Sequence, residues 1–261
     1  MIRFTVVTVT YNAGATIERT LRSVAAQSYV AVEHLIVDGC STDDTMTHIH
    51  FYVEQNTDQQ HPHTINLVRE PDQGLYDAMN KAIQQAKGDY LIFLNAGDCF
   101  HDANVLTTVA AQLEERYNPS RRPAVVYGET DLVDDEGHFL RHRRLQAPKR
   151  LRSDSFIHGM LVCHQSFYVR TDIARTELYD LRFRFSADYD WCIRIMRRAE
   201  SRGLALHNAQ LILTDYLAEG MTTRNHRRSL MERFRLMSRH YGWTRAVAAH
   251  LWFVVRAVVK R

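Results

Sequence analysis

Polar side chains that can bind sugar hydroxyls or a metal ion recur at four points in the first hundred residues, each directly after a short apolar run. The four segments are Thr10-Tyr11-Asn12, Asp38-Gly39, Glu70 to Gly74 and Asn95 to Asp98. Three of them place a carboxylate or an amide beside a glycine. Carboxylate and amide oxygens accept hydrogen bonds from ribose hydroxyls and bases, and they ligate hard divalent cations. The segments predict one site for a charged small molecule, provided that the fold brings them together.

Several well-known phosphate-binding and hydrolase motifs are missing. The sequence has no G-x-x-x-x-G-K-[ST] loop, no G-x-G-x-x-G after the first apolar run, no H-E-x-x-H and no G-x-S-x-G. Acidic loops can still hold a nucleoside diphosphate when a divalent cation neutralises the phosphates. The pattern therefore favours a metal-assisted nucleotide site over a glycine-rich phosphate cradle.

The spacing of apolar residues predicts strands and helices that alternate around these segments. Strands are expected at 4–9, 32–37, 65–68 and 90–94, and helices at 13–27, 45–54, 75–87 and 103–116. This alternation is typical of an α/β fold with a mostly parallel central sheet flanked by helices, in which ligands bind beyond the carboxyl ends of the strands. Later in the chain we expect short strands at 125–127, 139–143 and 211–216, a helix at 189–203, and an ambiguous stretch at 153–168.

The composition is that of a folded globular protein. The chain has 261 residues, of which 45% are apolar and 24% charged, so a disordered or fibrous chain is excluded. The four cysteines lie far apart without a C-x-x-C pair, which argues against a zinc knuckle or a disulfide framework and favours the reduced cytosol. We expect no export signal and no transmembrane span, since the longest apolar stretch falls short of the ~20 residues that a span takes.

Several motifs resemble those of the inverting family-two glycosyltransferases, which have the type-A, nucleotide-diphospho-sugar transferase fold. They are V-T-V-T-Y-N ending at Asn12, L-I-V-D-G-C-S-T-D-D-T at 35–45, the segment 70–98, and H-G-M-L-V-C-H-Q-S-F-Y at 158–168 followed by F-S-A-D-Y-D-W at 185–191. The last pair is similar to the bacterial exopolysaccharide and O-antigen branch, including colanic acid-type transferases. The resemblance implies a glycosyltransferase domain at 1–220, with a nucleotide-sugar-binding half at 1–116 and an acceptor half at 117–220. A basic, helical C-terminal extension follows at 221–261.

By matching positions, the resemblance places a nucleotide sugar against seven residues: Thr10, Tyr11, Asn12, Asp38, Asp72, Gly74 and Asn95. For Asp38 and Gly39, a turn that ends the strand is the alternative, and for Asp72 and Gly74 it is capping of the following helix. Asp98 is expected to ligate Mg²⁺ or Mn²⁺. Because Asn95 stands where the family usually has another aspartate, the diphosphate must supply more of the metal affinity. His226 is a further candidate ligand, with a solvated side chain as the alternative.

The resemblance also assigns the chemistry of transfer. Asp188 matches the family's general base, which takes the proton of the acceptor hydroxyl as that hydroxyl attacks from the side opposite the leaving diphosphate. Asp190 is the alternative base, and it projects roughly 200° away on a helix, so the two carboxylates do not face one substrate. His164 and Gln165 match a pair near the donor sugar or the acceptor, and Trp191 is a candidate for stacking on a sugar. Packing in the core is the alternative for His164 and Trp191.

The end of the chain is strongly basic. Residues 221–261 hold nine arginines and one lysine against one glutamate, Glu232, a net charge of +9, so residues 1–220 carry −6 of the total of +3. An amphipathic helix is expected at 243–259, with one apolar and one basic face. The apolar face has Trp243, Val247, Leu251, Val254 and Val258, and the basic face has Arg245, Arg256 and Lys260. Such a helix can lie on the inner face of the cytoplasmic membrane, or it can pack on the protein's own core or in a dimer.

The resemblance predicts inverting transfer of a hexose or deoxyhexose from a nucleoside-diphosphate sugar to a saccharide acceptor linked to polyprenyl diphosphate, in bacterial surface-polysaccharide synthesis. We expect a cytoplasmic enzyme that is peripheral to the inner membrane and has no nucleic-acid partner. One alternative is a sugar-phosphate nucleotidyl transferase, which usually has a glycine- and basic-rich loop where this chain has Asn12 to Ala15. The other is a nucleic-acid-binding protein that uses the basic tail.

Overall fold

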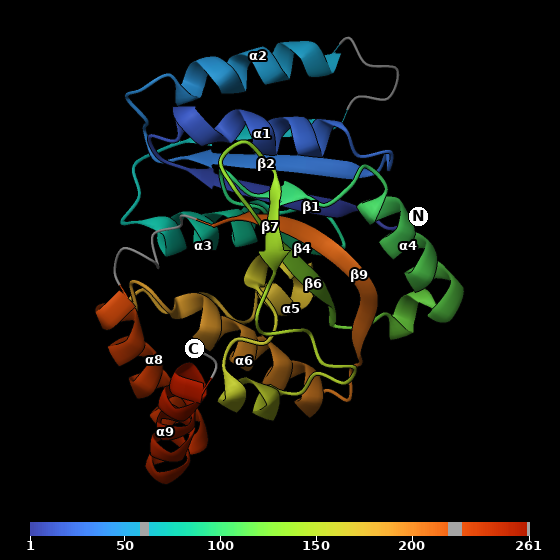
Figure 1. Ribbon diagram of the computed structural model, residues 1–261. Helices are drawn as coiled ribbons and strands as arrows, with labels where there is room; N and C mark the ends of the chain where they lie inside the picture. The colour runs from blue at the N-terminus through green and yellow to red at the C-terminus, as the bar shows by residue number, and fades with distance from the viewer. Residues whose placement is uncertain (58–62, 219–225, 260–261) are drawn as a thin grey trace.

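The computed structural model describes residues 1–57, 63–218 and 226–259, and it confirms the predicted alternation of strands and helices in the first half (Figure 1). The strands are β1 (Phe4–Thr10), β2 (Val32–Asp38), β3 (Thr64–Arg69), β4 (Tyr90–Phe93), β5 (Cys99–Phe100), β6 (Val125–Val133), β7 (Phe139–His142), β8 (Phe167–Arg170) and β9 (Leu206–Leu217). The helices are α1 (Gly14–Ala25), α2 (Thr45–Thr57), α3 (Leu75–Gln85), α4 (Val105–Arg116), α5 (Thr171–Ala174), α6 (Ala187–Ser201), α8 (His226–Tyr241) and α9 (Trp243–Val259).

The strands form one sheet with a parallel half and a mixed half. Within the described residues the order is β3-β2-β1-β4-β8-β6-β9-β5, and β7 pairs with β6. Strands β1 to β4 run parallel, as the alternation with helices predicts. Strand β8 runs antiparallel to both β4 and β6, and β7 returns along β6 through a short turn, which requires an antiparallel pair. The sheet is therefore mixed where the sequence pattern changes.

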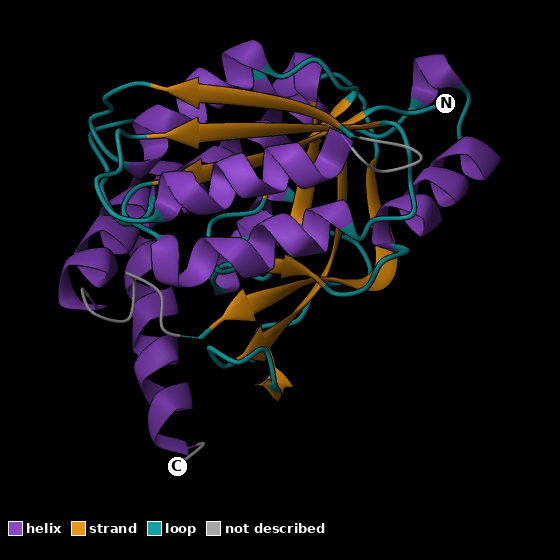
Figure 2. Cartoon of the chain, turned by 90° about the horizontal axis from the view of Figure 1, so that it is seen from above, coloured by secondary structure: helices purple, strands orange, loops and turns teal. Residues whose placement is uncertain are grey.

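Helices cover both faces of the parallel half, which explains its continuous apolar strands. In β1, Phe4 and Val6 pack in the same core as α4, whereas Val7 and Val9 pack with α3 and α6. All seven residues of β1 are buried, as expected for a strand that is enclosed on both sides. Figures 1 and 2 show α1 and α2 on one side of these strands, and Figure 1 shows α3 on the other.

The parallel register brings the predicted polar segments to one edge of the sheet. Thr10, the last residue of β1, pairs with Asp38, the last residue of β2. Phe93 at the end of β4 pairs with Val7 of β1, and Asn95 follows two residues later. The carboxyl ends of three strands therefore meet, and the loops that follow them share this edge.

The second half contains elements that the sequence pattern did not indicate. The ambiguous stretch 153–168 contains two 3-10 helices, η2 (Ser153–His158) and η3 (His164–Ser166). The predicted helix at 243–259 is confirmed as α9, and the helical extension expected at 221–261 also contains α8, whose bounds were not predicted. Helix α8 contributes Leu236 and Met237 to the core that contains α6. The boundary at residue 220 between transferase domain and tail stays a prediction, although α8 packs against the domain.

Candidate active site

The Asp38 carboxylate at the end of β2 is buried, and both of its oxygens accept hydrogen bonds. Its side chain is 0% exposed, and it accepts hydrogen bonds from the backbone N–H of Ser41, at 2.9 Å, and from the Ser41 hydroxyl. The Arg69 guanidinium lies 3.4 Å from the same carboxylate. This geometry fixes the turn after β2 and neutralises the charge of Asp38, so the turn is rigid before any ligand arrives.

Asn12 ties the loop after β1 to this turn. Its Oδ1 accepts from the N–H of Thr42 at 2.9 Å, and its own N–H donates to the Ser41 hydroxyl at 2.8 Å. The residue has φ of 48°, in the left-handed region that asparagine tolerates better than most residues. Asn12 therefore has a structural role, whereas its neighbour Tyr11 is 63% exposed and presents its ring at the edge of the sheet.

The loop before α3 lies against the turn after β2. A Cβ at Gly39 would lie 2.4 Å from the Asp72 carboxylate and 3.3 Å from the Tyr11 ring, so a larger residue there would have to displace the Asp72 side chain. Asp72 accepts from the N–H of Gly74 at 2.7 Å, and Gly74, with φ of 119°, is the N-cap of α3. Asp72 thus orders the start of α3, which supports the capping alternative. We call these three loops, residues 10–12, 38–41 and 70–74, the donor loops.

Asp98 and Gln165 form a buried pair beyond the end of β4. The Gln165 side-chain amide donates to Asp98 Oδ2 at 2.8 Å, and the N–H of Leu217 donates to Oδ1 at 3.2 Å. Burial raises the pKa of Asp98 to about 6, and the hydrogen bonds from Gln165 and Leu217 oppose this shift. Residues of η3, β9 and the loop after β4 therefore meet at one carboxylate.

His164, the neighbour of Gln165, connects Asn95 to Asp188. Its Nδ1 lies 3.5 Å from Asp188 Oδ2, and its Nε2 lies 3.3 Å from the Asn95 side-chain amide nitrogen. With the amide placed in this way, Nε2 accepts a hydrogen bond and Nδ1 carries the proton that faces Asp188. Asn95, predicted with the nucleotide-binding residues, thus lies across the His164 ring from the predicted base.

Asp188 is partly open and ionised. Its side chain is 20% exposed, and the Tyr76 hydroxyl donates to Oδ1 at 3.2 Å. Burial alone would raise the pKa of Asp188, but the hydrogen bond from His164 and the positive charge of Arg233 outweigh burial and lower it. The carboxylate therefore stays in its proton-accepting form at neutral pH. We call Tyr76, Asn95, Asp98, His164, Gln165 and Asp188 the η3 cluster.

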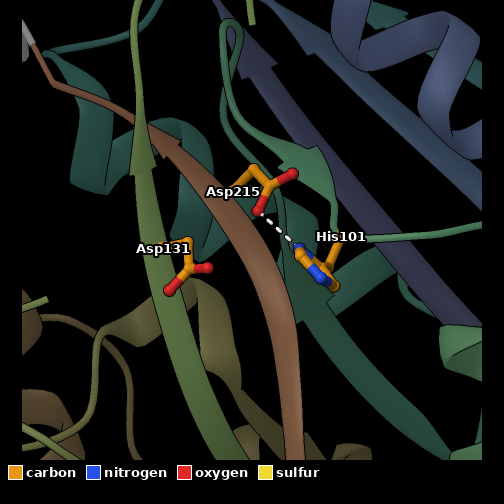
Figure 3. Close-up of side chains that lie close together, drawn as sticks. All are labelled: His101, Asp131 and Asp215. Carbon is orange, nitrogen blue, oxygen red and sulfur yellow. Dashed lines mark hydrogen bonds and ion pairs between the residues drawn. The ribbon is translucent and has the colours of Figure 1, made fainter. Parts of the chain in front are cut away.

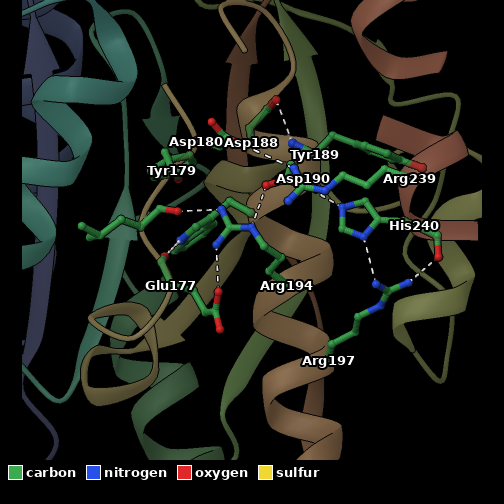
Figure 4. Close-up of polar contacts among 12 residues, drawn as sticks. Glu177, Tyr179, Asp180, Asp188, Tyr189, Asp190, Arg194, Arg197, Arg239 and His240 are labelled. Carbon is green, nitrogen blue, oxygen red and sulfur yellow. Dashed lines mark hydrogen bonds and ion pairs between the residues drawn. The ribbon is translucent and has the colours of Figure 1, made fainter. Parts of the chain in front are cut away.

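Asp190 is not available as a base in this structure. Its side chain is 0% exposed and is held by Arg194 Nε at 2.6 Å and by His240 Nε2 at 2.7 Å, as Figure 4 shows. The same figure shows Arg194 reaching Glu177 as well. Of the two aspartates, Asp190 serves the packing of α6 against α8, and Asp188 faces the η3 cluster.

Trp191 lies in the core and not at a sugar site. It is 0% exposed, its ring stacks on Tyr179 with centroids 4.7 Å apart, and its indole N–H donates to the Glu177 carbonyl. The prediction that Trp191 stacks on a sugar therefore does not fit the structure, because the helix turns this side chain inward. The side chain of His226, the further candidate metal ligand, lies outside the described residues.

The residues at the end of β4 fit an oxygen-coordinated cation. Asn95 Oδ1 is buried and has no hydrogen-bond partner, which is the state of an acceptor that a hard cation would satisfy. Asp98 follows three residues later and brings the carboxylate. This donor set matches Mg²⁺ or Mn²⁺ better than a soft metal.

A second group of possible ligands lies elsewhere (Figure 3). Ligand atoms of His101, Asp131 and Asp215 all lie within 4.8 Å of one another, and His101 already pairs with Asp215 at 2.8 Å. Thr214 bonds to the Gln165 carbonyl, so the next residue of β9, Asp215, points to the opposite face of the sheet. This group therefore does not share a space with the η3 cluster.

The structure brings some of the predicted residues together and leaves others apart. Asp98 and Asp188 converge on adjacent residues of η3, namely Gln165 and His164. Within the described part of the chain, no hydrogen bond joins Asp38 to either of them. Helix α3 connects the two groups, because Gly74 caps it and Tyr76 in its first turn reaches Asp188.

Sequence reasoning missed three partners in this region: Ser41, Arg69 and Tyr76. Ser41 and Tyr76 lie inside the quoted motifs, so their position was available as a signal, but their hydrogen-bond partners were not. Arg69 ends β3, and the parallel register with Asp38 at the end of β2 is what makes it a neighbour.

Comparison with known proteins identifies the family. The profile described as Glycosyl transferase family 2 matches residues 5–176. The "PGL/p-HBAD biosynthesis glycosyltransferase" of Mycobacterium bovis (strain BCG / Pasteur 1173P2) is 31% identical over 192 residues, which cover 73% of this chain and 68% of that relative.

Solved structures show the same fold at low sequence identity. The crystal structure of S. aureus TarS 1-349 has a TM-score of 0.69 and 15% identity, covering 97% of this chain and 72% of that one. The mannosyltransferase PcManGT from Pyrobaculum calidifontis, solved with GDP-Man and Mn²⁺, has a TM-score of 0.61 and 17% identity, covering 95% and 74%. The match of the family profile decides against the nucleotidyl transferase alternative. The chain belongs to glycosyl transferase family 2, and it is a glycosyltransferase with the type-A fold.

Proposed function

We propose that this glycosyltransferase moves a hexosyl or deoxyhexosyl group from a nucleoside-diphosphate sugar to a saccharide hydroxyl with inversion, and that Asp188 is the general base. The observation that carries the proposal is the η3 cluster, where an ionised, partly open carboxylate contacts His164, and His164 contacts Asn95 beyond the end of β4. A single carboxylate on the attacking side is what an inverting displacement requires. Surface-polysaccharide synthesis is the proposed setting, because the motifs around His164 and Asp188 resemble that branch.

The residues around Asp188 have separate roles in the proposed transfer. Asp188 takes the proton of the acceptor hydroxyl as the new C1–O bond forms, and the bond from C1 to the diphosphate oxygen breaks with its electron pair on the diphosphate. His164 and Tyr76 hold the Asp188 carboxylate in place through its two oxygens. Positioning of this kind matters because a small displacement of a reacting group lowers the rate steeply.

A divalent cation at Asn95 and Asp98 would neutralise the diphosphate as it leaves. The buried, unpartnered oxygen of Asn95 supports this part of the proposal. So does PcManGT, the neighbour with the same fold, whose structure contains GDP-Man and Mn²⁺. In this chain Asp98 and Asn95 would hold the ion, and the donor loops would contact the nucleotide.

The test is a transfer assay with UDP-, GDP- and dTDP-sugars and a panel of saccharide-lipid acceptors, with Mn²⁺ and with EDTA. We expect product with one nucleotide, loss of turnover in EDTA, and a product whose anomeric configuration, read by NMR, is opposite to that of the donor. A product that retains the donor configuration would contradict the assignment of Asp188.

The proposed location is the inner face of the cytoplasmic membrane, where a polyprenyl-linked acceptor would be presented. Helix α9 packs through Ala246, which is fully buried, while Trp243, Leu251 and Val254 of the predicted apolar face are exposed. Trp252 and Val255 are exposed beside them. Val258 and Lys260 lie outside the described side chains.

An exposed apolar surface flanked by arginines suits an anionic lipid headgroup region. Within the described chain, every helix is too short or too polar to cross a bilayer.

Sedimentation with vesicles tests this location. The enzyme is mixed with vesicles of phosphatidylglycerol and phosphatidylcholine, or of phosphatidylcholine alone, and the bound fraction is measured. We expect the double variant Leu251→Ser, Val254→Ser to lose most of its binding to the anionic vesicles. Phe51→Ser, which changes an exposed apolar residue on α2, is the matched control and should bind normally. Equal binding by both variants would remove the membrane role of α9.

A further inference from the structure

Glu232 is the only acidic residue among the 41 of the segment 221–261, and it faces the start of α6. Its two carboxylate oxygens accept hydrogen bonds from the backbone N–H groups of Arg184, at 3.0 Å, and Phe185, at 2.8 Å. These residues stand immediately before Ser186, the N-cap of α6, and Asp188 lies in the first turn. Hydrogen bonds between a charged acceptor and backbone N–H groups are among the stronger ones in proteins.

Other residues of α8 contact the same short segment. The buried Ser186 hydroxyl reaches the carbonyl of Ser229 at 3.3 Å. The Arg233 guanidinium lies over the Tyr189 ring, 5.7 Å from its centroid. Helix α8 thus contacts the chain on both sides of Asp188, at Ser186 before it and at Tyr189 after it.

The Asp188 carboxylate is therefore located by two sets of contacts. His164 and Tyr76 hold the carboxylate itself, whereas α8 holds the backbone that carries it. If the backbone at the start of α6 shifted, the Asp188 carboxylate would lose its contact with His164 or with Tyr76. Because Glu232 holds this backbone, the distance between the proposed base and its substrate depends on Glu232.

We propose that Glu232 is a positioning residue for the reaction, which sets the start of α6 and so the place of Asp188. This inference rests on the proposed role of Asp188 as the base. It assigns α8 to the catalytic unit, although the residues of α8 are outside the segment 5–176 that matches the family profile.

The experiment compares Glu232→Gln with Glu200→Gln in steady-state transfer assays on the full chain. Glu200 is a matched control, because it lies near the other end of α6 and its carboxylate also accepts two hydrogen bonds, both from Ser153. In Glu232→Gln, the side-chain NH₂ group meets a backbone N–H donor. We expect kcat to fall by about 10- to 100-fold, with the donor KM and the affinity for the free nucleotide unchanged. Glu232→Asp should recover part of the loss.

Other outcomes overturn the inference. If Glu200→Gln lowers kcat as much as Glu232→Gln does, or if Glu232→Gln raises only the donor KM, Glu232 does not act through Asp188. If Glu232→Gln does not fold, the same kinetic comparison is made with Glu232→Asp, whose shorter side chain cannot reach both N–H groups as Glu232 does, and a kcat equal to that of the natural chain rejects the proposal. Full activity of Asp188→Asn would instead reject the proposed base, which separates the two failures.

Discussion

The donor loops and the η3 cluster lie at the same edge of the sheet but are held together differently. In the donor loops the partners are near in sequence or on adjacent strands, as with Asp38 and Ser41, which are three residues apart. In the η3 cluster the partners are distant, since Tyr76 and Asp188 are 112 residues apart and Asp98 and Gln165 are 67 apart. The first region is built by local turns and the second by tertiary packing.

This difference indicates how each region responds to change. The donor loops form a surface held by short-range hydrogen bonds, in which the buried Thr10 hydroxyl has no partner and the Tyr11 ring is exposed. The η3 cluster holds the charge of Asp188, the proposed base. Substitutions in the donor loops should therefore change binding, and substitutions in the η3 cluster should change turnover.

Asp188→Asn is the strongest test of the expected difference between the donor loops, which should affect binding, and the η3 cluster, which should affect turnover. Removing the proton acceptor should lower kcat by about 10²- to 10⁴-fold, while the affinity for the nucleotide stays within a small factor. Steady-state kinetics and calorimetric titration of the nucleotide measure the two quantities. Asp190→Asn is the companion variant, and it should lower the stability of the fold more than the rate constant of transfer. If Asp190→Asn abolishes turnover and Asp188→Asn does not, the two roles are reversed.

Acid should weaken the half of the molecule that carries the donor loops. His34 of β2 is fully buried between Thr8 and Tyr52, and burial lowers its pKa from 6.5 to about 3. Because the unfolded chain takes up this proton near pH 6.5 and the folded chain does not, stability is lost as pH falls from 6.5 toward 3. His34 alone should reduce the free energy of unfolding by about 3 kcal/mol between pH 7 and pH 4.

Denaturant unfolding at several pH values measures this effect. His34→Gln keeps a hydrogen-bonding side chain but removes the titrating group, so its stability should depend less on pH than that of the natural chain. Parallel pH profiles for the two proteins would show instead that His34 has nearly the same pKa in the folded and the unfolded chain.

Tyr11→Ala tests the open contact of the donor loops and should have the smallest effect. Loss of an aromatic ring that stacks on a base costs about 1–3 kcal/mol in other nucleotide-binding proteins, so we expect the donor KM to rise about tenfold with little change in kcat. Tyr11→Phe keeps the ring and should behave as the natural enzyme does. A fall in kcat without a change in KM would show that Tyr11 acts in turnover, as the η3 cluster is expected to do, and would contradict the expected difference between the two regions.

Much of the first half could be read from the sequence. The strands at 4–9, 32–37 and 90–94 and the helix at 75–87 were found within a few residues of β1, β2, β4 and α3. Their boundaries follow from apolar periodicity and glycine positions, which act over a few residues. Even α9 was predicted with its bounds, because its apolar and basic faces have a helical period.

The second half was less predictable for a physical reason. The stretch 153–168 forms η2 and η3, whose 3-10 turns have no long period, and α8 is rich in arginine, so neither gives a clear apolar pattern. Strand β8 begins at Phe167, at the end of the same stretch, and its antiparallel place between β4 and β6 depends on pairing with strands far away in sequence.

The sequence by itself determined the α/β alternation, the polar loops at one sheet edge and the family to which the chain belongs, because these depend on residue order and short spacing. Helical geometry also showed that the side chains of Asp188 and Asp190 must project from the helix in different directions. Only the tertiary structure decided which of them is open, since His240 and Arg194 bury Asp190 while His164 and Tyr76 hold Asp188. The environment of a side chain is set by the elements that pack around it, and those elements come from distant parts of the chain.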